Sequence, residues 1–128
     1  MVQHMRIAIP LWQGRISPVF DEASRILIFD ISKKQEQSHP QGALISQDPF
    51  ERAQLFAKLK VDLLICGMIS KAQQAAIISA GVRIIPHICG SIEDVLAAFL
   101  DGRIERGEMR MPGCGSPKQF RKINRKEV

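Results

Sequence analysis

The residues with the clearest chemical potential are the cysteines, Cys66, Cys89 and Cys114, each of which is followed directly by glycine. A cysteine thiolate is a soft ligand for transition metals, and an adjacent glycine leaves room for a bulky cluster to approach the sulfur. Helix N-termini predicted after Cys66 and Cys89 would favour thiolates and an anionic ligand. Cys66 and Cys89 both stand in an Ile-Cys-Gly sequence, and His87, two residues before Cys89, is a candidate fourth ligand. The pattern therefore predicts a metal site built on thiolates.

Other interpretations of the same residues stay open. Free cysteine is among the most buried residue types, so each cysteine could simply pack into a core. A histidine near a strand end often makes only a hydrogen bond. The wide cysteine spacing also differs from the compact Cys-x-x-Cys pattern of zinc ribbons and ferredoxins. The alternatives are a redox-responsive or zinc-binding regulatory module that uses the cysteines with His87, and a protein-interaction domain with inert cysteines.

Length and charge predict one compact domain followed by a basic end. The chain has 128 residues, of which 45% are hydrophobic and 24% charged, and this is enough for a single core. The net charge is +5, and residues 118–128 alone carry +4 of it. We therefore expect an α/β domain over residues 1–104 and a cysteine-bearing loop with a basic tail over residues 105–128. The tail is either a solvated terminus or a contact for an acidic partner or nucleic acid, and the folded body gives no reason to expect nucleic-acid binding.

The sequence also excludes several classes of protein. No apolar run reaches the ~20 residues of a membrane helix, and the first residues lack the apolar stretch of a secretory signal. We therefore expect a cytoplasmic protein with reduced thiols and no membrane partner. The sequence contains no P-loop, no G-x-G-x-x-G and no H-E-x-x-H motif, and the first strand carries no acidic residue for a two-metal nuclease. The expected protein is not an enzyme.

Apolar runs predict the strands of the sheet. Four of them are β-branched and bounded by turn or polar residues, at residues 5–10, 25–31, 61–65 and 82–86. Residues 33–46 are polar with a weakly apolar end, which indicates a hairpin turn and a fifth strand at the edge of the sheet.

Helix end signals and an internal repeat predict how the cysteines are placed. Asp48, Ser70 and Ser91 are suited to be N-caps of three helices. Residues 61–81 and 82–102 each run as strand, Cys-Gly, helix and glycine, and this alternation implies parallel strands. Cys66 and Cys89 should therefore lie at neighbouring strand ends on the carboxyl edge of the sheet, with Cα atoms within about 10 Å.

The loop after the first strand, residues 11–24, should leave from the same edge. We expect Trp12 and Phe20 to border this edge and shield it from water, unless Phe20 packs into the core. Asp21 and Glu22 suit a short helical turn. Cys114 lies among glycines and prolines, so its segment could close over a cluster held by the other two cysteines.

Three long stretches carry a resemblance to a known family. "RIAIPLWQGRISPVFDEASRILIFDI", "VDLLICGMIS" and "GVRIIPHICGSIEDVLAAFLDGRI" resemble the dinitrogenase iron-molybdenum cofactor biosynthesis family, over most of residues 6–104. This resemblance implies a three-layer α/β/α, ribonuclease-H-like fold with a mixed five-stranded sheet. It also implies a metal-binding protein that carries or helps to assemble an iron-sulfur or mixed metal-sulfide cluster, with a cluster donor or recipient protein as its partner.

The resemblance also indicates cofactor-binding residues. Ser17, Pro18 and Phe20 match the family's first loop, although Val19 stands where a histidine is often found. Gly67 and Gly90 match the family's glycine turns. The resemblance therefore implies that these residues line the cofactor site and that cysteine replaces histidine as the anchoring ligand.

Overall fold

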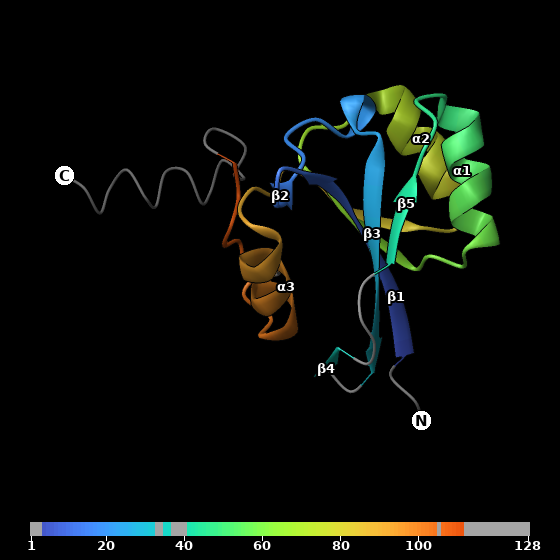
Figure 1. The fold of residues 1–128 in the computed structure, drawn as a ribbon. Helices are drawn as coiled ribbons and strands as arrows, with labels where there is room; N and C mark the ends of the chain where they lie inside the picture. The colour runs from blue at the N-terminus through green and yellow to red at the C-terminus, as the bar shows by residue number, and fades with distance from the viewer. Residues whose placement is uncertain (1–3, 33–34, 37–40, 105, 112–128) are drawn as a thin grey trace.

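The computed structural model describes residues 4–32, 35–36, 41–104 and 106–111, which fold around a mixed β-sheet (Figure 1). The strand order is β4–β3–β1–β6–β7, with β1 (His4–Trp12) in the middle. β1 pairs antiparallel with β3 (Arg25–Ser32) and parallel with β6 (Leu63–Ile65), and β6 pairs parallel with β7 (Arg83–Ile85). All four strands predicted from apolar runs are therefore confirmed, β6 and β7 being shorter than expected.

The short strands complete the sheet. β4 (Gln35–Glu36) and β5 (Gln41–Leu44) both pair antiparallel with β3, so the predicted hairpin and edge strand are confirmed, with the edge divided into two pieces. β2 (Arg15–Ile16) pairs with the end of β1 and was not predicted. Two residues are too few to show an alternating pattern, and this strand depends on the turn at Gln13 and Gly14, whose φ angles are 52° and 79°.

Each helix begins at the N-cap that the sequence predicted. In α1 (Pro49–Lys58) the Asp48 carboxylate accepts a hydrogen bond from the backbone N–H of residue 51 at 2.9 Å. In α2 (Lys71–Ser79) and α3 (Ile92–Leu100) the hydroxyls of Ser70 and Ser91 accept from the N–H groups of residues 73 and 94, at 3.2 and 3.1 Å. These bonds satisfy N–H groups that have no partner inside the helix.

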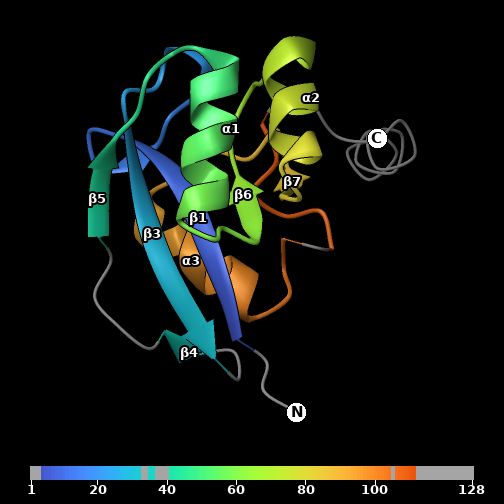
Figure 2. The ribbon, with the colours of Figure 1, turned by 90° about the vertical axis from the view of Figure 1, so that its right-hand side faces the viewer.

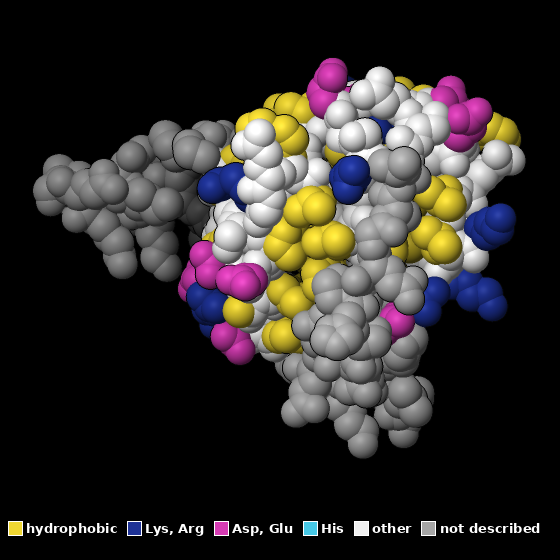
Figure 3. Space-filling view, in the orientation of Figure 1, with side chains coloured by type: hydrophobic (Ala, Val, Ile, Leu, Met, Phe, Trp, Pro, Cys, Tyr) yellow, Lys and Arg dark blue, Asp and Glu magenta, His cyan; other side chains and the backbone are white. Residues whose placement is uncertain are grey.

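The helices cover the two faces of the sheet unequally. α1 and α2 pack on one face and α3 on the other (Figures 1 and 2), which gives three layers. Side chains alternate along each strand, so Ile7 and Ile9 join the core beneath α3 while Ala8 joins the core beneath α1 and α2. Since α3 alone covers its face, hydrophobic side chains remain visible beside it on the β3 side (Figure 3).

Two further expectations concern membrane helices and the segment of Cys114. None of the helices in the described ranges is long and apolar enough to cross a bilayer. Cys114 and the basic tail lie outside the described residues, so the closing of this segment over a cluster stays a prediction.

Candidate functional site

The segments that follow β1, β6 and β7 meet at the carboxyl edge of the sheet. Because the three strands are parallel, they end at the same side of the molecule. Backbone hydrogen bonds join the segments: Phe20 N–H donates to Met68 O at 2.7 Å, and Met68 N–H donates to Pro18 O at 2.8 Å. His87 N–H in turn donates to Gly67 O at 2.9 Å. The loop after β1 therefore does leave from the edge that holds the cysteines.

Cys66 and Cys89 lie at neighbouring strand ends, as predicted from the repeat. Ile88 N–H donates to Cys66 O at 2.9 Å, and Cys89 is the next residue along the chain. The two backbones are thus directly adjacent, although their side chains have different surroundings.

Cys66 is fully buried in the core beneath α1 and α2. Burial raises the pKa of its thiol from 9.0 to about 12, because a thiolate there would lose its hydration. This result corrects the expectation that the α2 N-terminus would favour a thiolate at Cys66. The reason is that Cys66 points to the same face of the sheet as Leu64, two residues earlier, and so enters the core. The cost of removing a thiolate from water there exceeds the stabilisation that the helix dipole could give.

Cys89 is partly exposed and is held by a second segment of the chain, residues 109–111. Its N–H donates to Met109 O at 2.8 Å, and its thiol lies 3.8 Å from Arg110 O. Met111 N–H donates to His87 O at 2.8 Å, so residues 109–111 run antiparallel beside residues 87–89. His87 and Met109 both have left-handed backbone conformations, with φ angles of 65° and 68°. Strain of this kind is often found at ligand sites.

Two polar atoms in these paired segments have no partner within the described residues. His87 Nδ1 and Arg110 Nε are buried and make no hydrogen bond there. An unpaired buried polar atom costs free energy, so a ligand that satisfies it would be stabilised. His87 and Cys89 therefore share one loop, which pairs with residues 109–111. Across the described ranges, however, no group of three or more His, Cys, Asp or Glu residues is arranged to hold a metal ion.

The residues indicated by the family resemblance have clear structural positions. The Ser17 hydroxyl is buried and donates to Val19 O at 3.2 Å. Phe20 packs into the core against Phe56, with ring centroids 6.2 Å apart, so the core interpretation holds for Phe20 and the shielding interpretation does not. Asp21 and Glu22 do lie in a short helical turn, η1 (Phe20–Glu22), as expected.

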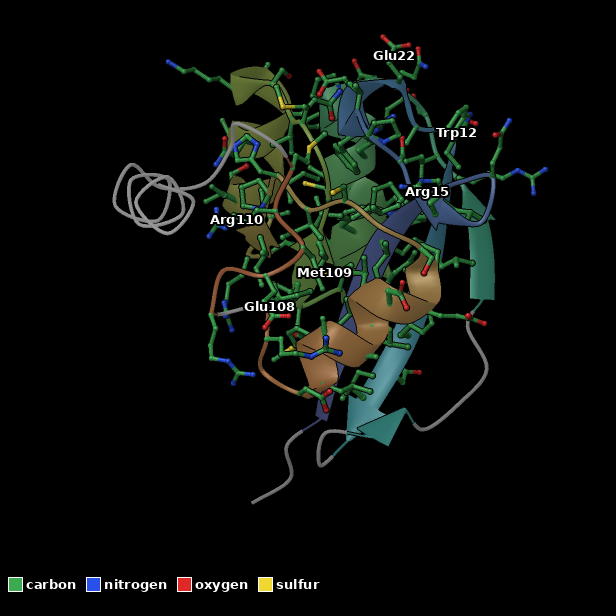
Figure 4. The ribbon with its side chains drawn as sticks, turned by 90° about the vertical axis from the view of Figure 1, so that its left-hand side faces the viewer. Trp12, Arg15, Glu22, Glu108, Met109 and Arg110 are labelled. Atoms are coloured by element: carbon green, nitrogen blue, oxygen red, sulfur yellow. The ribbon has the colours of Figure 1, made fainter. Side chains whose placement is uncertain are left out.

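Trp12 is 51% exposed and borders a shallow hollow. The hollow has a volume of about 300 Å³ and is mostly apolar, being lined by Leu11, Trp12, Ser17, Pro18, Val19, Glu22, Ala23 and Ser24. In Figure 4, Trp12 and Glu22 lie on one side of the α3 face and Arg110 on the other. The hollow is therefore a separate feature from the surroundings of Cys89.

Arg52 is a site residue that the sequence reasoning missed. It lies on α1, is fully buried, and donates to the backbone carbonyls of the loop after β1. Burial lowers its pKa. The available signal was its spacing: Arg52 precedes Phe56 by one helical turn, so both belong to the face of α1 that packs on the sheet.

Comparisons with known proteins agree with this architecture. The family model described as dinitrogenase iron-molybdenum cofactor matches residues 3–102. The crystal structure of PH0822 has a TM-score of 0.71 and 20% identity, over 77% of this chain and 93% of that one. A Methanocaldococcus jannaschii protein whose name refers to dinitrogenase has a TM-score of 0.61 and 22% identity, over 78% and 91%. The apo form of the orange protein from Desulfovibrio gigas has a TM-score of 0.58 and 20% identity, over 88% of this chain and 96% of that one. No curated protein matches. At these identities the solved structures indicate a shared fold.

Proposed function

Because the chain belongs to the dinitrogenase iron-molybdenum cofactor family, we propose that it binds a metal-sulfur cluster as cargo and carries it or helps to assemble it. The cluster is of the iron-sulfur or iron-molybdenum type, and the chain itself catalyses no reaction. The protein works in the cytoplasm with a cluster donor or recipient protein, on a scaffold of the ribonuclease-H-like kind.

The observation that carries this proposal is the environment of Cys89. Cys89 is partly exposed at the carboxyl edge. His87, two residues before it, has a buried Nδ1 without a partner among the described residues, and so does the Nε of Arg110, whose carbonyl lies 3.8 Å from the Cys89 thiol. A thiolate can anchor iron, and a guanidinium stabilises negative charge on sulfide. His87 can act as a ligand or donate a hydrogen bond to the cluster. Together, these groups could bind the metal and the sulfide of one anionic cluster.

The cysteines have different roles in this proposal. Cys89 is the first anchor, and Cys114 supplies a second thiolate from outside the described residues. Cys66 has a buried side chain and a pKa raised to about 12, which suits a packing role better than ligation. Ser17, Pro18, Gly67 and Gly90 shape the loops around the cargo.

Anaerobic reconstitution tests the proposal. The protein is incubated with ferrous iron and sulfide, with and without molybdate, and bound iron, molybdenum and acid-labile sulfide are measured per chain together with the visible spectrum. We expect a coloured protein that contains iron and sulfide. Cys89→Ser and Cys114→Ser should lower the occupancy, and Cys66→Ala, the control, should keep it. Equal occupancy in Cys89→Ser and the parent, or no sulfide in the parent, would contradict the proposal.

A zinc-binding regulatory module is the second candidate, because Cys89 and the unpaired His87 Nδ1 are also the donor types that zinc prefers. The same metal analysis separates the two functions. A zinc protein would be colourless and would contain zinc without acid-labile sulfide.

A further inference from the structure

Arg52 is a buried cation that is bound by backbone carbonyls. Its Nη1 donates to Phe20 O at 2.5 Å, and its Nη2 donates to Ala23 O at 2.5 Å and to Asp21 O at 3.3 Å. Its Nε donates to Ser46 O. Among the described residues no carboxylate is a hydrogen-bond partner of this side chain, which is 0% exposed. The guanidinium also lies 4.4 Å from the centre of the Phe20 ring.

These contacts make Arg52 and the loop after β1 depend on each other. Burying a charge is costly, and the guanidinium is stabilised by these carbonyl oxygens together with the nearby negative charge of Asp21. The carbonyls at Phe20, Asp21 and Ala23 belong to η1 and the residue after it. Within this short turn Phe20 O accepts from the Ala23 N–H at 3.0 Å, so Arg52 adds a second donor there and holds the carbonyls of Asp21 and Ala23 as well. The planar fork of arginine presents five N–H donors, which lets it hold four carbonyls from two separate segments at once, whereas lysine has only three donors on one nitrogen.

The loop that Arg52 holds is fastened to the carboxyl edge. Phe20 N–H donates to Met68 O at 2.7 Å, and the Asp21 carboxylate accepts from Ser70 N–H at 2.9 Å. Both bonds join η1 to the segment between β6 and α2. That segment contacts the loop of Cys89 through His87 N–H, which donates to Gly67 O at 2.9 Å. A continuous series of hydrogen bonds therefore leads from Arg52 to the proposed anchor.

We propose that Arg52 is a positioning residue, which sets the conformation of residues 17–23 and thereby keeps the carboxyl edge in the form that receives the cargo. Its effect on the loop is independent of the cargo. Its effect on cargo uptake rests on the proposed function.

The first test uses the cargo-free protein. Arg52→Met keeps the length of the side chain and removes every donor, while Arg52→Lys keeps the charge and removes the fork. Amide hydrogen exchange is followed by NMR at Phe20, Met68 and Ser70. We expect Arg52→Met to speed exchange at these amides by about tenfold or more, because a hydrogen bond to a charged group is worth that much. Arg52→Lys should give a smaller increase.

Two references separate local from global effects. The Asp94 N–H, bonded to the Ser91 hydroxyl on α3, lies in the opposite layer and should change much less. Ile77→Val removes one methylene from the same core and lowers global stability without removing any of the hydrogen bonds of the loop named above. If Arg52→Met does not fold, Arg52→Lys gives the same comparison.

The outcomes are distinguishable. If Phe20, Met68 and Ser70 gain no more exchange than Asp94, or no more than in Ile77→Val, then Arg52 acts only through global stability and the inference is wrong. If the loop loosens but iron and sulfide uptake equals that of the parent, the positioning role is wrong while the proposed function stands. If the parent takes up no cluster, the proposed function is wrong. The exchange comparison then still decides whether Arg52 stabilises the conformation of the loop.

Discussion

Gly67 lies directly against the backbone of Pro18: a Cβ atom built on Gly67 would come within 2.5 Å of Pro18 O. The same oxygen accepts the Met68 N–H at 2.8 Å, so the loop after β1 cannot move away without losing this hydrogen bond. The glycine at this position is therefore required by contact between two loops, and the contact fixes the distance between β1 and β6 at the carboxyl edge.

Gly67→Ala should consequently lower the free energy of unfolding by about 2–3 kcal/mol, the usual effect of overpacking a rigid contact. Urea denaturation measures this change. Gly14→Ala is the matched control, because Gly14 has a φ of 79° but no atom within 4 Å of its built Cβ. It should cost only about 1 kcal/mol, for the backbone conformation alone. Equal losses in the two variants would show that the loop yields easily at Gly67.

Lys60→Gly should stabilise the protein by about 1 kcal/mol and raise its Tm by about 4 °C. Lys60 has a φ of 59° just after the C-terminus of α1, where its N–H donates to Ala57 O at 3.1 Å. The equivalent positions after α2 and α3 are Gly81 and Gly102, which adopt this left-handed conformation without a Cβ penalty. Gly81→Lys should show the opposite change in calorimetry. A lower Tm for Lys60→Gly would mean that the lysine side chain contributes a contact worth more than the strain.

The stability of the protein should fall between pH 9 and pH 12 because of Cys66. The unfolded thiol ionises near pH 9.0, whereas the folded one stays protonated up to about pH 12. In this window the unfolded state binds fewer protons, so unfolding becomes more favourable as the pH rises, by up to about 1.4 kcal/mol per pH unit. The stabilising contribution is complete below pH 9.

Urea midpoints measured from pH 8 upward test this contribution. Cys66→Ala should lose the slope that Cys66 adds, so the difference in stability between parent and variant should change steadily above pH 9, and Cys89→Ser should keep the slope. The chain has no tyrosine, and its lysines titrate alike in the parent and in Cys66→Ala, so the difference between the two slopes reports on Cys66. An unchanged slope in Cys66→Ala would contradict the prediction.

Gly90→Ala should loosen the segment that holds Cys89. Gly90 has a φ of 133°, which strains any residue with a Cβ, and a Cβ there would also meet the methyl end of the flexible Met109 side chain. We expect a loss of about 1–3 kcal/mol and a faster reaction of the Cys89 thiol with a thiol reagent, measured in a Cys114→Ser background. Adding Met109→Ala should recover part of the loss, because the clash disappears while the backbone strain remains. Strictly additive losses would show that Gly90 and Met109 do not interact.

The sequence by itself determined the features that depend on neighbouring residues. Asp48, Ser70 and Ser91 cap their helices through bonds that span three residues, so the local pattern contains both partners. The repeated strand, cysteine and helix units were enough to place Cys66 and Cys89 at adjacent strand ends, because parallel strands must end at the same edge.

Only the tertiary structure decided what each side chain there can do. Cys66 and Cys89 share the same Ile-Cys-Gly context, yet one is buried under α1 and α2 while the other is held partly exposed by residues 109–111. Arg52 meets Phe20 32 residues away in the sequence, and no local pattern encodes that contact. Burial and hydrogen bonding depend on which distant segments cover a position, and these two quantities set the charge and reach of a functional group.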